Sequence, residues 1–189
     1  MPGNYLEVDV CQFLFYHHKQ RSKMTTLSKT KDIIDHYFPD LILGANDGII
    51  TTFAVVAASQ GAGYGKMIII TLGLANLFAD GVSMGASNYL AQRSRNSSDH
   101  NVSHRNSIQH GIATFVGFMI AGALPLIIYL TPTCNHFYWA VAITFATSFA
   151  VGAARALFIP ANWFKAGMEM FTIGVLAALI AFIVGTFVG

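Results

Sequence analysis

The sequence predicts an all-α integral membrane protein with five transmembrane helices, and three observations support this class. Of the 189 residues, 54% are apolar and only 11% are charged, which is too few charges to cover a soluble protein of this size. Five apolar stretches reach the roughly 20 residues that a helix needs to cross a bilayer. The basic residues fall almost entirely on one side of these stretches, as in membrane proteins of defined orientation.

The five spans are expected at about residues 41–59, 67–91, 108–130, 137–159 and 168–189. Short polar connections separate them, so residues 40–189 are expected to form one transport domain. Residues 25–39 place apolar side chains beside lysines, a pattern that predicts an amphipathic helix on the cytosolic surface. Residues 1–24 do not resemble a signal peptide and are expected to be a disordered leader.

The basic residues predict the orientation of the chain. With the N-terminus in the cytosol, ten of the 11 lysines and arginines lie on the cytosolic side and only Lys66 lies outside. The ten are Lys19, Arg21, Lys23, Lys29, Lys31, Arg93, Arg95, Arg105, Arg155 and Lys165. Cytosolic loops are enriched in these residues, so we expect a cytosolic N-terminus and a C-terminus on the outer or lumenal side. Glu169 is either an ion-pair partner of Lys165 and Arg155 or part of the cytosolic entrance.

Two aspartates interrupt the apolar spans. Asp47 lies in the first span and Asp80 in the second, where an unpaired carboxylate costs at least ~2.5 kcal/mol on insertion scales. Helical spacing places each in a polar stripe. The stripe of the second span holds Asn76, Asp80, Met84 and Ser87 or Asn88, and that of the first span holds Asp40, Gly44, Asp47 and Thr51, with Asn46 beside it.

These side chains suit a divalent transition metal. Carboxylate and amide oxygens with one thioether match a borderline ion such as Fe²⁺ or Mn²⁺ better than a purely hard ion. The predicted ligands are Asp47, Asp80, Met84, Asn76 and Asn46. Asp47 and Asp80 are also predicted to accept protons when the metal leaves, because desolvation favours a neutral carboxyl group. In the alternative interpretation the aspartates only bond neighbouring helices together and Met84 only fills space.

One protomer offers few ligands for a six-coordinate ion, whereas a site on a two-fold axis would double the set. We therefore expect a homodimer. His100 and His104, four residues apart in the cytosolic loop beside His110, are weaker candidates for metal capture, because a solvated loop explains them as well. No nucleophile with an adjacent base and no phosphate-binding loop is present, so neither an enzyme nor a cofactor is expected.

Two motifs resemble the vacuolar iron transporter family, which includes nodulin-21-like and bacterial proteins. They are LILGANDGIITTFAVVAA, residues 41–58, and GLANLFADGVSMGASNYLA, residues 73–91, and weaker similarity continues through residues 110–130 and the last span. The resemblance implies a dimeric five-helix carrier that moves Fe²⁺ or Mn²⁺ out of the cytosol in exchange for protons. By motif position, Asp47 matches the family's first-helix aspartate and Met84 its second-helix methionine.

The chain departs from the plant-type pattern in two ways. Asn76 replaces the glutamate of the second helix, and the acid appears four residues later as Asp80. The long glutamate-rich metal-binding domain between the second and third spans is replaced by a short polar segment. The sequence therefore resembles the short nodulin-21-like or bacterial form, located in the inner or plasma membrane of a bacterium or in a vacuolar or other endomembrane of a eukaryote.

The expected function is proton-coupled export of Fe²⁺ or Mn²⁺ for metal homeostasis. The expected partners are metal ions, protons, the lipid bilayer and a second copy of the chain, without nucleic acid. A non-transporting membrane scaffold or metal sensor is the alternative from another functional class. An exporter of organic cations is disfavoured because the stripes lack an aromatic cage.

Overall fold

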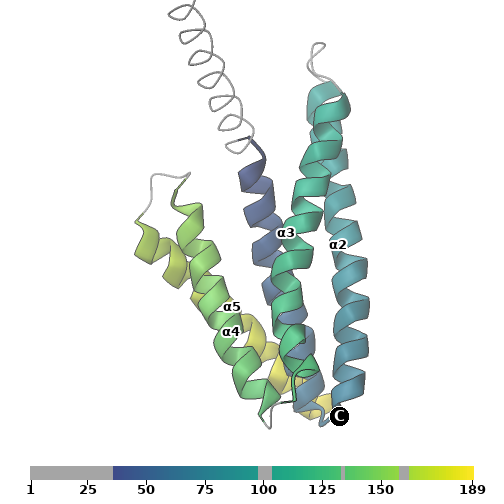
Figure 1. The fold of residues 1–189 in the computed structure, drawn as a ribbon, viewed down its shortest axis with the longest axis vertical. Coiled ribbons are helices and arrows are strands. Elements are labelled where there is room, and N and C mark those ends of the chain that lie inside the picture. Colours follow the sequence, from purple (N-terminus) through teal and green to yellow (C-terminus); the bar gives the residue numbers. More distant parts are fainter. Residues whose placement is uncertain (1–35, 98–103, 133–134, 158–161) are drawn as a thin grey trace, which may run out of the picture. The chain divides into compact units, whose positions relative to one another are not determined.

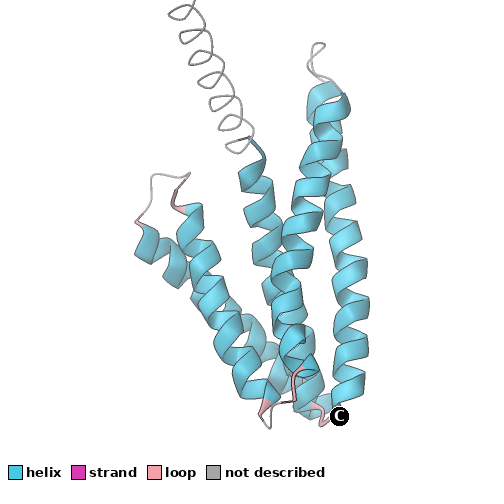
Figure 2. Cartoon of the chain, in the orientation of Figure 1, coloured by secondary structure: helices cyan, strands magenta, loops and turns pink. Residues whose placement is uncertain are grey.

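The computed structural model describes residues 36–97, 104–132, 135–157 and 162–189. These residues form five helices that are long and apolar enough to cross a membrane, and they contain no strand (Figures 1 and 2). The helices are His36–Gly61, which is called the first helix here, α2 (Lys66–Ser97), α3 (His104–Leu130), α4 (His136–Arg155) and α5 (Trp163–Val188). The prediction of an all-α protein with five spans is confirmed.

Residues Tyr37–Gly189 form one compact unit, and the contacts described here lie within it. The expected leader, most of the expected amphipathic helix and His100 lie outside the described residues. Several helix ends differ from the expected spans: α2 continues to Ser97 rather than 91, α4 ends at Arg155 rather than 159, and α5 begins at Trp163 rather than 168. Apolar length fixes only the part of a helix inside the hydrocarbon layer, and polar or aromatic ends extend beyond it.

The first helix lies directly against α3, through glycines that leave no side chain between the two backbones. A Cβ added to Gly44 or Gly48 would overlap the backbone of Thr114 or Phe118, respectively. In the opposite direction, a Cβ on Gly117 would overlap the backbone of Leu41. Helix association in lipid depends on such close packing, because burial from water contributes little there.

The helix α2 packs against the other side of α3, where Gly85 and Gly111 face each other: a Cβ on Gly111 would come within 2.6 Å of the Gly85 carbonyl oxygen. The spaced glycines of the first two spans therefore pack within the protomer. An apolar cluster fills the space between the helices, and Phe53 and Phe118 are its largest buried members. The first helix, α2 and α3 form one group of closely packed helices (Figure 1).

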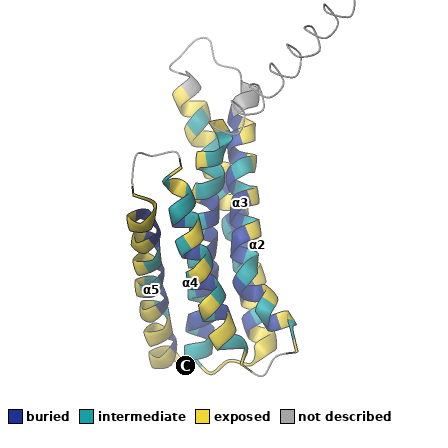
Figure 3. Ribbon diagram, turned by 60° about the vertical axis from the view of Figure 1, so that its left-hand side comes forward, coloured by how far each residue is buried: buried dark blue, intermediate teal, exposed yellow. Residues whose placement is uncertain are grey.

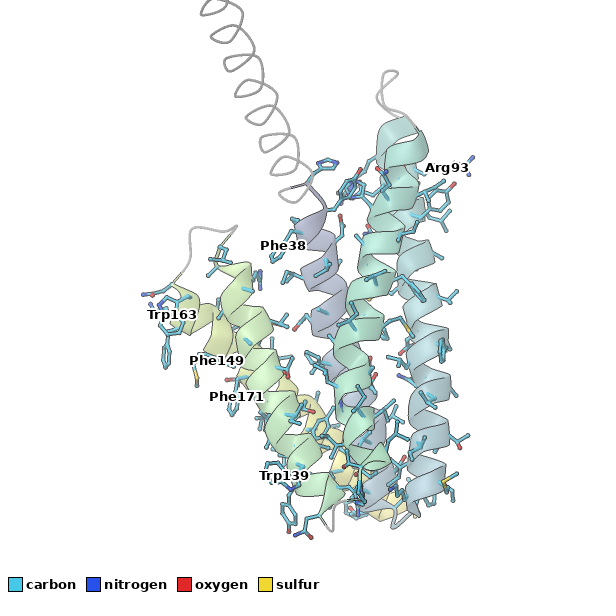
Figure 4. The ribbon with its side chains drawn as sticks, in the orientation of Figure 1. Phe38, Arg93, Trp139, Phe149, Trp163 and Phe171 are labelled. Carbon is cyan, nitrogen blue, oxygen red and sulfur yellow. The ribbon has the colours of Figure 1, made fainter. Side chains whose placement is uncertain are left out.

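The last two helices form a hairpin. A Cβ on Gly152 of α4 would come within 2.6 Å of the Ala166 carbonyl oxygen of α5, and Phe149 contacts the rings of Trp163 and Phe164 with centroid distances of 6.4 and 5.9 Å (Figure 4). At its other end, α5 crosses the first helix where a Cβ on Gly185 would overlap the backbone of Ala58. The hairpin is therefore held to the first helix near the C-terminal end of α5.

Exposed apolar side chains cover much of the surface, above all on α5, where more than half of the residues are exposed (Figure 3). The largest exposed fractions belong to Phe187, Val188, Leu157, Tyr138 and Met67. The polar ends of the helices frame this surface. At one end, Lys66 Nζ lies 3.4 Å from the Thr131 carbonyl oxygen and 3.4 Å from His136 Nε2. An apolar surface between polar ends is the arrangement expected of an integral membrane protein.

The contact between Gly117 and Leu41 leads to a stability prediction. Gly117→Ala should lower the melting temperature of the detergent-solubilised protein, because the new methyl group overlaps backbone that cannot rotate away; overpacking of this kind typically costs about 1–3 kcal/mol. Gly65→Ala is the matched control, since nothing lies within 4 Å of a Cβ at that position. Equal melting temperatures for the two variants would contradict the close approach.

Candidate metal site

Two carboxylates lie together near the middle of their helices. Asp47 of the first helix and Asp80 of α2 are close enough for their charges to interact, and both are half-buried in the protomer. Neither side chain forms a hydrogen bond or an ion pair with any described residue. The sequence prediction placed both residues in the same site, and the structure brings them together.

The predicted stripe on α2 has a consistent position in the fold. Asn76, Asp80, Met84 and Asn88 are all half-buried, whereas the adjacent row of Gly73, Leu77, Gly81 and Gly85 is buried. Met84 also packs against the apolar cluster that contains Phe53 and Phe118. The stripe thus borders the packed face of α2, where it can serve an ion path and the helix contacts together.

The two other predicted amide ligands lie on different helices. Asn76 holds its Nδ2 buried without a hydrogen-bond partner, on the same stripe as Asp80. Asn46 also has a buried and unpartnered atom, Oδ1, but it lines a pocket formed with α4 and α5. The role of both residues as ligands stays a prediction, and it is Asn76 that shares a stripe with an aspartate.

A second polar group joins three helices nearer to the start of the first helix. Asp40 accepts a hydrogen bond of 2.8 Å from Asn88 Nδ2 of α2, and its other carboxylate oxygen lies 2.5 Å from His110 Nδ1 of α3. Asn88 Nδ2 also lies 2.6 Å from the hydroxyl of Thr114, which in turn donates to the His110 carbonyl oxygen over 3.0 Å. We call these four residues the Asp40 network.

Sequence reasoning found only parts of this network. Asp40 and Asn88 belong to the two predicted polar stripes, but the pairing with His110 and the role of Thr114 were missed. His110 lies within the expected third span but was considered only as a neighbour of His100 and His104; it is 9% exposed within α3. The available signal was its place at the start of an apolar helix, where a buried polar side chain needs a partner.

The weaker candidates do not add to the pair of aspartates. His104 begins α3, and His100 is not among the described residues. Within the part of the chain that the structure describes, no three His, Cys, Asp or Glu side chains converge to hold a metal ion. Glu169 is exposed on α5 and forms no ion pair with the described Lys165 or Arg155.

The Asp40 network leads to a comparison of two asparagines on one helix. Asn88→Ala should destabilise the protein by about 1–3 kcal/mol, because Asp40 and Thr114 lose a buried hydrogen-bond donor. Asn76→Ala should cost less, since its amide nitrogen has no partner to lose. Thermal unfolding of the two variants in the same detergent measures the difference, and a larger loss for Asn76→Ala would contradict this account.

Comparison with known proteins agrees with this architecture. The family model described as "VIT family" matches residues 38–106 and 96–186. The chain is 41% identical to a vacuolar iron transporter of Centaurea cyanus over 61 residues, which are 32% of this chain and 24% of that protein. It is 40% identical over 55 residues to vacuolar iron transporter 1 of Arabidopsis thaliana, covering 29% of the chain and 22% of the relative.

A third relative is the vacuolar iron transporter of Plasmodium berghei, with 35% identity over 79 residues, 33% of this chain and 29% of that protein. The aligned regions therefore span less than a third of each relative's length. The family model, in contrast, extends from the first helix into α5. On this evidence the chain, a multi-pass integral membrane protein, belongs to the VIT family.

Proposed function

We propose that this protein exports Fe²⁺ or Mn²⁺ from the cytosol in exchange for protons. The observation that carries the proposal is the pair formed by Asp47 and Asp80, two half-buried carboxylates that interact near the middle of their helices without a partner among the described residues. The names of the vacuolar iron transporters to which the chain is similar support iron as the cargo.

The electrostatics of the pair explain why a cation would bind there. Two ionised carboxylates at close range repel each other, and low-dielectric surroundings strengthen this repulsion. A divalent cation between them attracts both carboxylates, which outweighs their repulsion and offsets the cost of placing charge in the membrane. When the cation leaves, protons can neutralise the same two groups, so that one site alternates between metal and protons.

A second copy of the chain would complete the coordination. One protomer supplies two carboxylates, together with Met84 and Asn76 on the same stripe of α2, whereas Fe²⁺ and Mn²⁺ commonly take six ligands. A two-fold axis beside the stripe would double the carboxylates without additional sequence. We propose a homodimer whose partner contributes the same residues to a shared path.

Proton exchange supplies the energy that export needs. Moving a divalent ion out of an electrically negative cytosol costs about 4.6 kcal/mol per 100 mV, which is twice the value for a single charge. Inward movement of protons down their gradient offsets this cost. The proposed direction is the one that the resemblance to the vacuolar iron transporter family implies, and the basic residues, which include Arg93 and Arg155, support only the proposed orientation of the chain.

The alternative of a non-transporting scaffold or metal sensor predicts that the aspartates link helices. Among the described residues, polar links between helices involve the Asp40 network, the hydrogen bond from Tyr37 to Gln109, and the contacts around Lys66 and Tyr129. The side chains of Asp47 and Asp80 form none of them. Transport accounts for their position better, because a role in holding helices together requires a bond.

Transport in proteoliposomes with an imposed proton gradient tests the proposal. The purified protein should take up Fe²⁺ or Mn²⁺ more readily than Ca²⁺, as measured by quenching of an enclosed metal-sensitive fluorophore. Asp47→Asn and Asp80→Asn should each reduce uptake by at least about tenfold, since losing one carboxylate from a buried cation site costs well over 1.4 kcal/mol.

The control for this experiment is Thr172→Val, which removes one exposed hydroxyl group from α5. It should retain uptake, because Thr172 is not part of the aspartate pair. Each variant is first checked for an unchanged elution volume in gel filtration. Undiminished uptake in Asp47→Asn would refute the proposed site, and no uptake of any ion by the folded wild type would favour the scaffold.

The thioether of Met84 provides a test of metal preference. Met84→Leu keeps the apolar volume that packs against the core cluster but removes the sulfur ligand. If sulfur coordinates the cargo, the KM for Fe²⁺ should rise severalfold, while that for Mn²⁺, which prefers oxygen ligands, should change less. Identical KM values for wild type and variant with both ions would assign Met84 to packing alone.

A further inference from the structure

A pocket of about 390 Å³ lies between the first helix, α4 and α5, and its described lining includes neither Asp47 nor Asp80. Phe38, Ile42 and Leu43 of the first helix and Met170 of α5 give it apolar walls. Arg155 of α4 and Asn46 of the first helix supply polar groups. Its volume falls within the range of roughly 300–1,000 Å³ that is typical of ligand-binding pockets.

The helix crossings explain why this pocket exists. Near the C-terminal end of α5, Gly61 and Gly185 bring α5 and the first helix into backbone contact. Toward the beginning of α5, Gly152 keeps α4 against Ala166 of α5 instead. The hairpin therefore stays together, and among the described residues the pocket separates it from the beginning of the first helix, where Phe38 extends toward α4 (Figure 4).

The charge in the pocket favours an anion. Arg155 is the last residue of α4, is exposed, and forms no ion pair with any described residue. No described aspartate or glutamate lines the pocket, and Asp40, which follows the lining residue Pro39, bonds instead to Asn88 and His110. Arg155 has no acidic partner among the described residues, so its positive charge favours an anion over a cationic cargo in this pocket.

The position of Arg155 at the end of a membrane-spanning helix indicates where the anion comes from. The α4 span runs from His136 to Arg155, and a helix of this length crosses the hydrocarbon layer, so we expect the guanidinium at its end to reach the headgroup region, where phospholipid phosphates are found. Guanidinium groups bind phosphate through paired, charge-assisted hydrogen bonds. An amphiphile with an anionic head and an apolar chain matches both parts of the pocket.

We propose that this pocket binds one anionic phospholipid, with its phosphate on Arg155 and an acyl chain along Phe38, Leu43 and Met170. The lipid would fill the space between the first helix and the hairpin. Only the identity of the leaflet, which is the cytosolic one, depends on the orientation proposed above. The lipid site itself does not depend on which metal is transported or on whether transport is proton-coupled.

Native mass spectrometry of the full-length protein in detergent tests this site. Phosphatidylglycerol and phosphatidylcholine with matched acyl chains are added, and the bound fraction of each is measured. The wild type should retain phosphatidylglycerol preferentially. Arg155→Gln should weaken its retention about fivefold, the effect of roughly one cationic contact with an anionic lipid. Lys165→Gln, which removes an exposed cation outside the pocket, should retain the wild-type preference.

A second variant tests the apolar part of the pocket without altering charge. Leu43 is 49% exposed, so Leu43→Trp can fill the pocket without disturbing a packed helix contact, and it should also reduce retention of phosphatidylglycerol. Equal retention of both lipids by the wild type, or equal losses in Arg155→Gln and Lys165→Gln, would overturn the proposal. Displacement of the lipid by millimolar inorganic phosphate, or a disulfide between two copies of a Leu43→Cys variant, would also overturn it.

Discussion

The arrangement of this protein depends on one constraint: charge placed within a membrane must be neutralised. Asp47 and Asp80 concentrate two negative charges near the middle of the first helix and α2, and no described side chain bonds to either carboxylate. The Asp40 network has the opposite character, because each of its buried groups has a partner within the protomer. The protein thus separates a carboxyl group that links helices from the two carboxyl groups that we propose bind the ion.

The helix α3 links the two helices that carry the aspartate pair to the Asp40 network. It contacts the first helix through Gly117 and α2 through Gly111, and it supplies His110 to the Asp40 network. The hairpin of α4 and α5 is attached differently. Near one end, a glycine of α5 contacts the first helix, and near the other end a pocket separates the hairpin from that helix. The core that carries the aspartates is therefore built mainly from three helices, and the hairpin borders it on one side.

The number of helices could be predicted, and Asp47 and Asp80 could be singled out as candidates, because both features leave simple signals in the sequence. Apolar length identifies membrane spans, and an aspartate inside such a span is conspicuous. Helix ends were less accurate, since the residues from Trp163 onward join α5 although they lie before its most apolar part. The pairing of Asp40 with His110 was missed because it joins residues 70 positions apart in the sequence. Such pairings follow from the glycine contacts between helices, and those contacts cannot be assigned to particular partners from one sequence.

The glycines beside Asp47 also fix the direction in which its carboxylate points. Gly44 and Gly48 lie against the backbone of α3 and leave no room for even one additional carbon atom. A rotation of the first helix about its own axis by one residue, about 100°, would drive a bulkier side chain into Thr114 or Phe118. The rotation of the first helix about its axis, and with it the direction of the Asp47 side chain, is therefore fixed by the glycines that face α3. Conformational change at this level must move the first helix and α3 together, as a single rigid block.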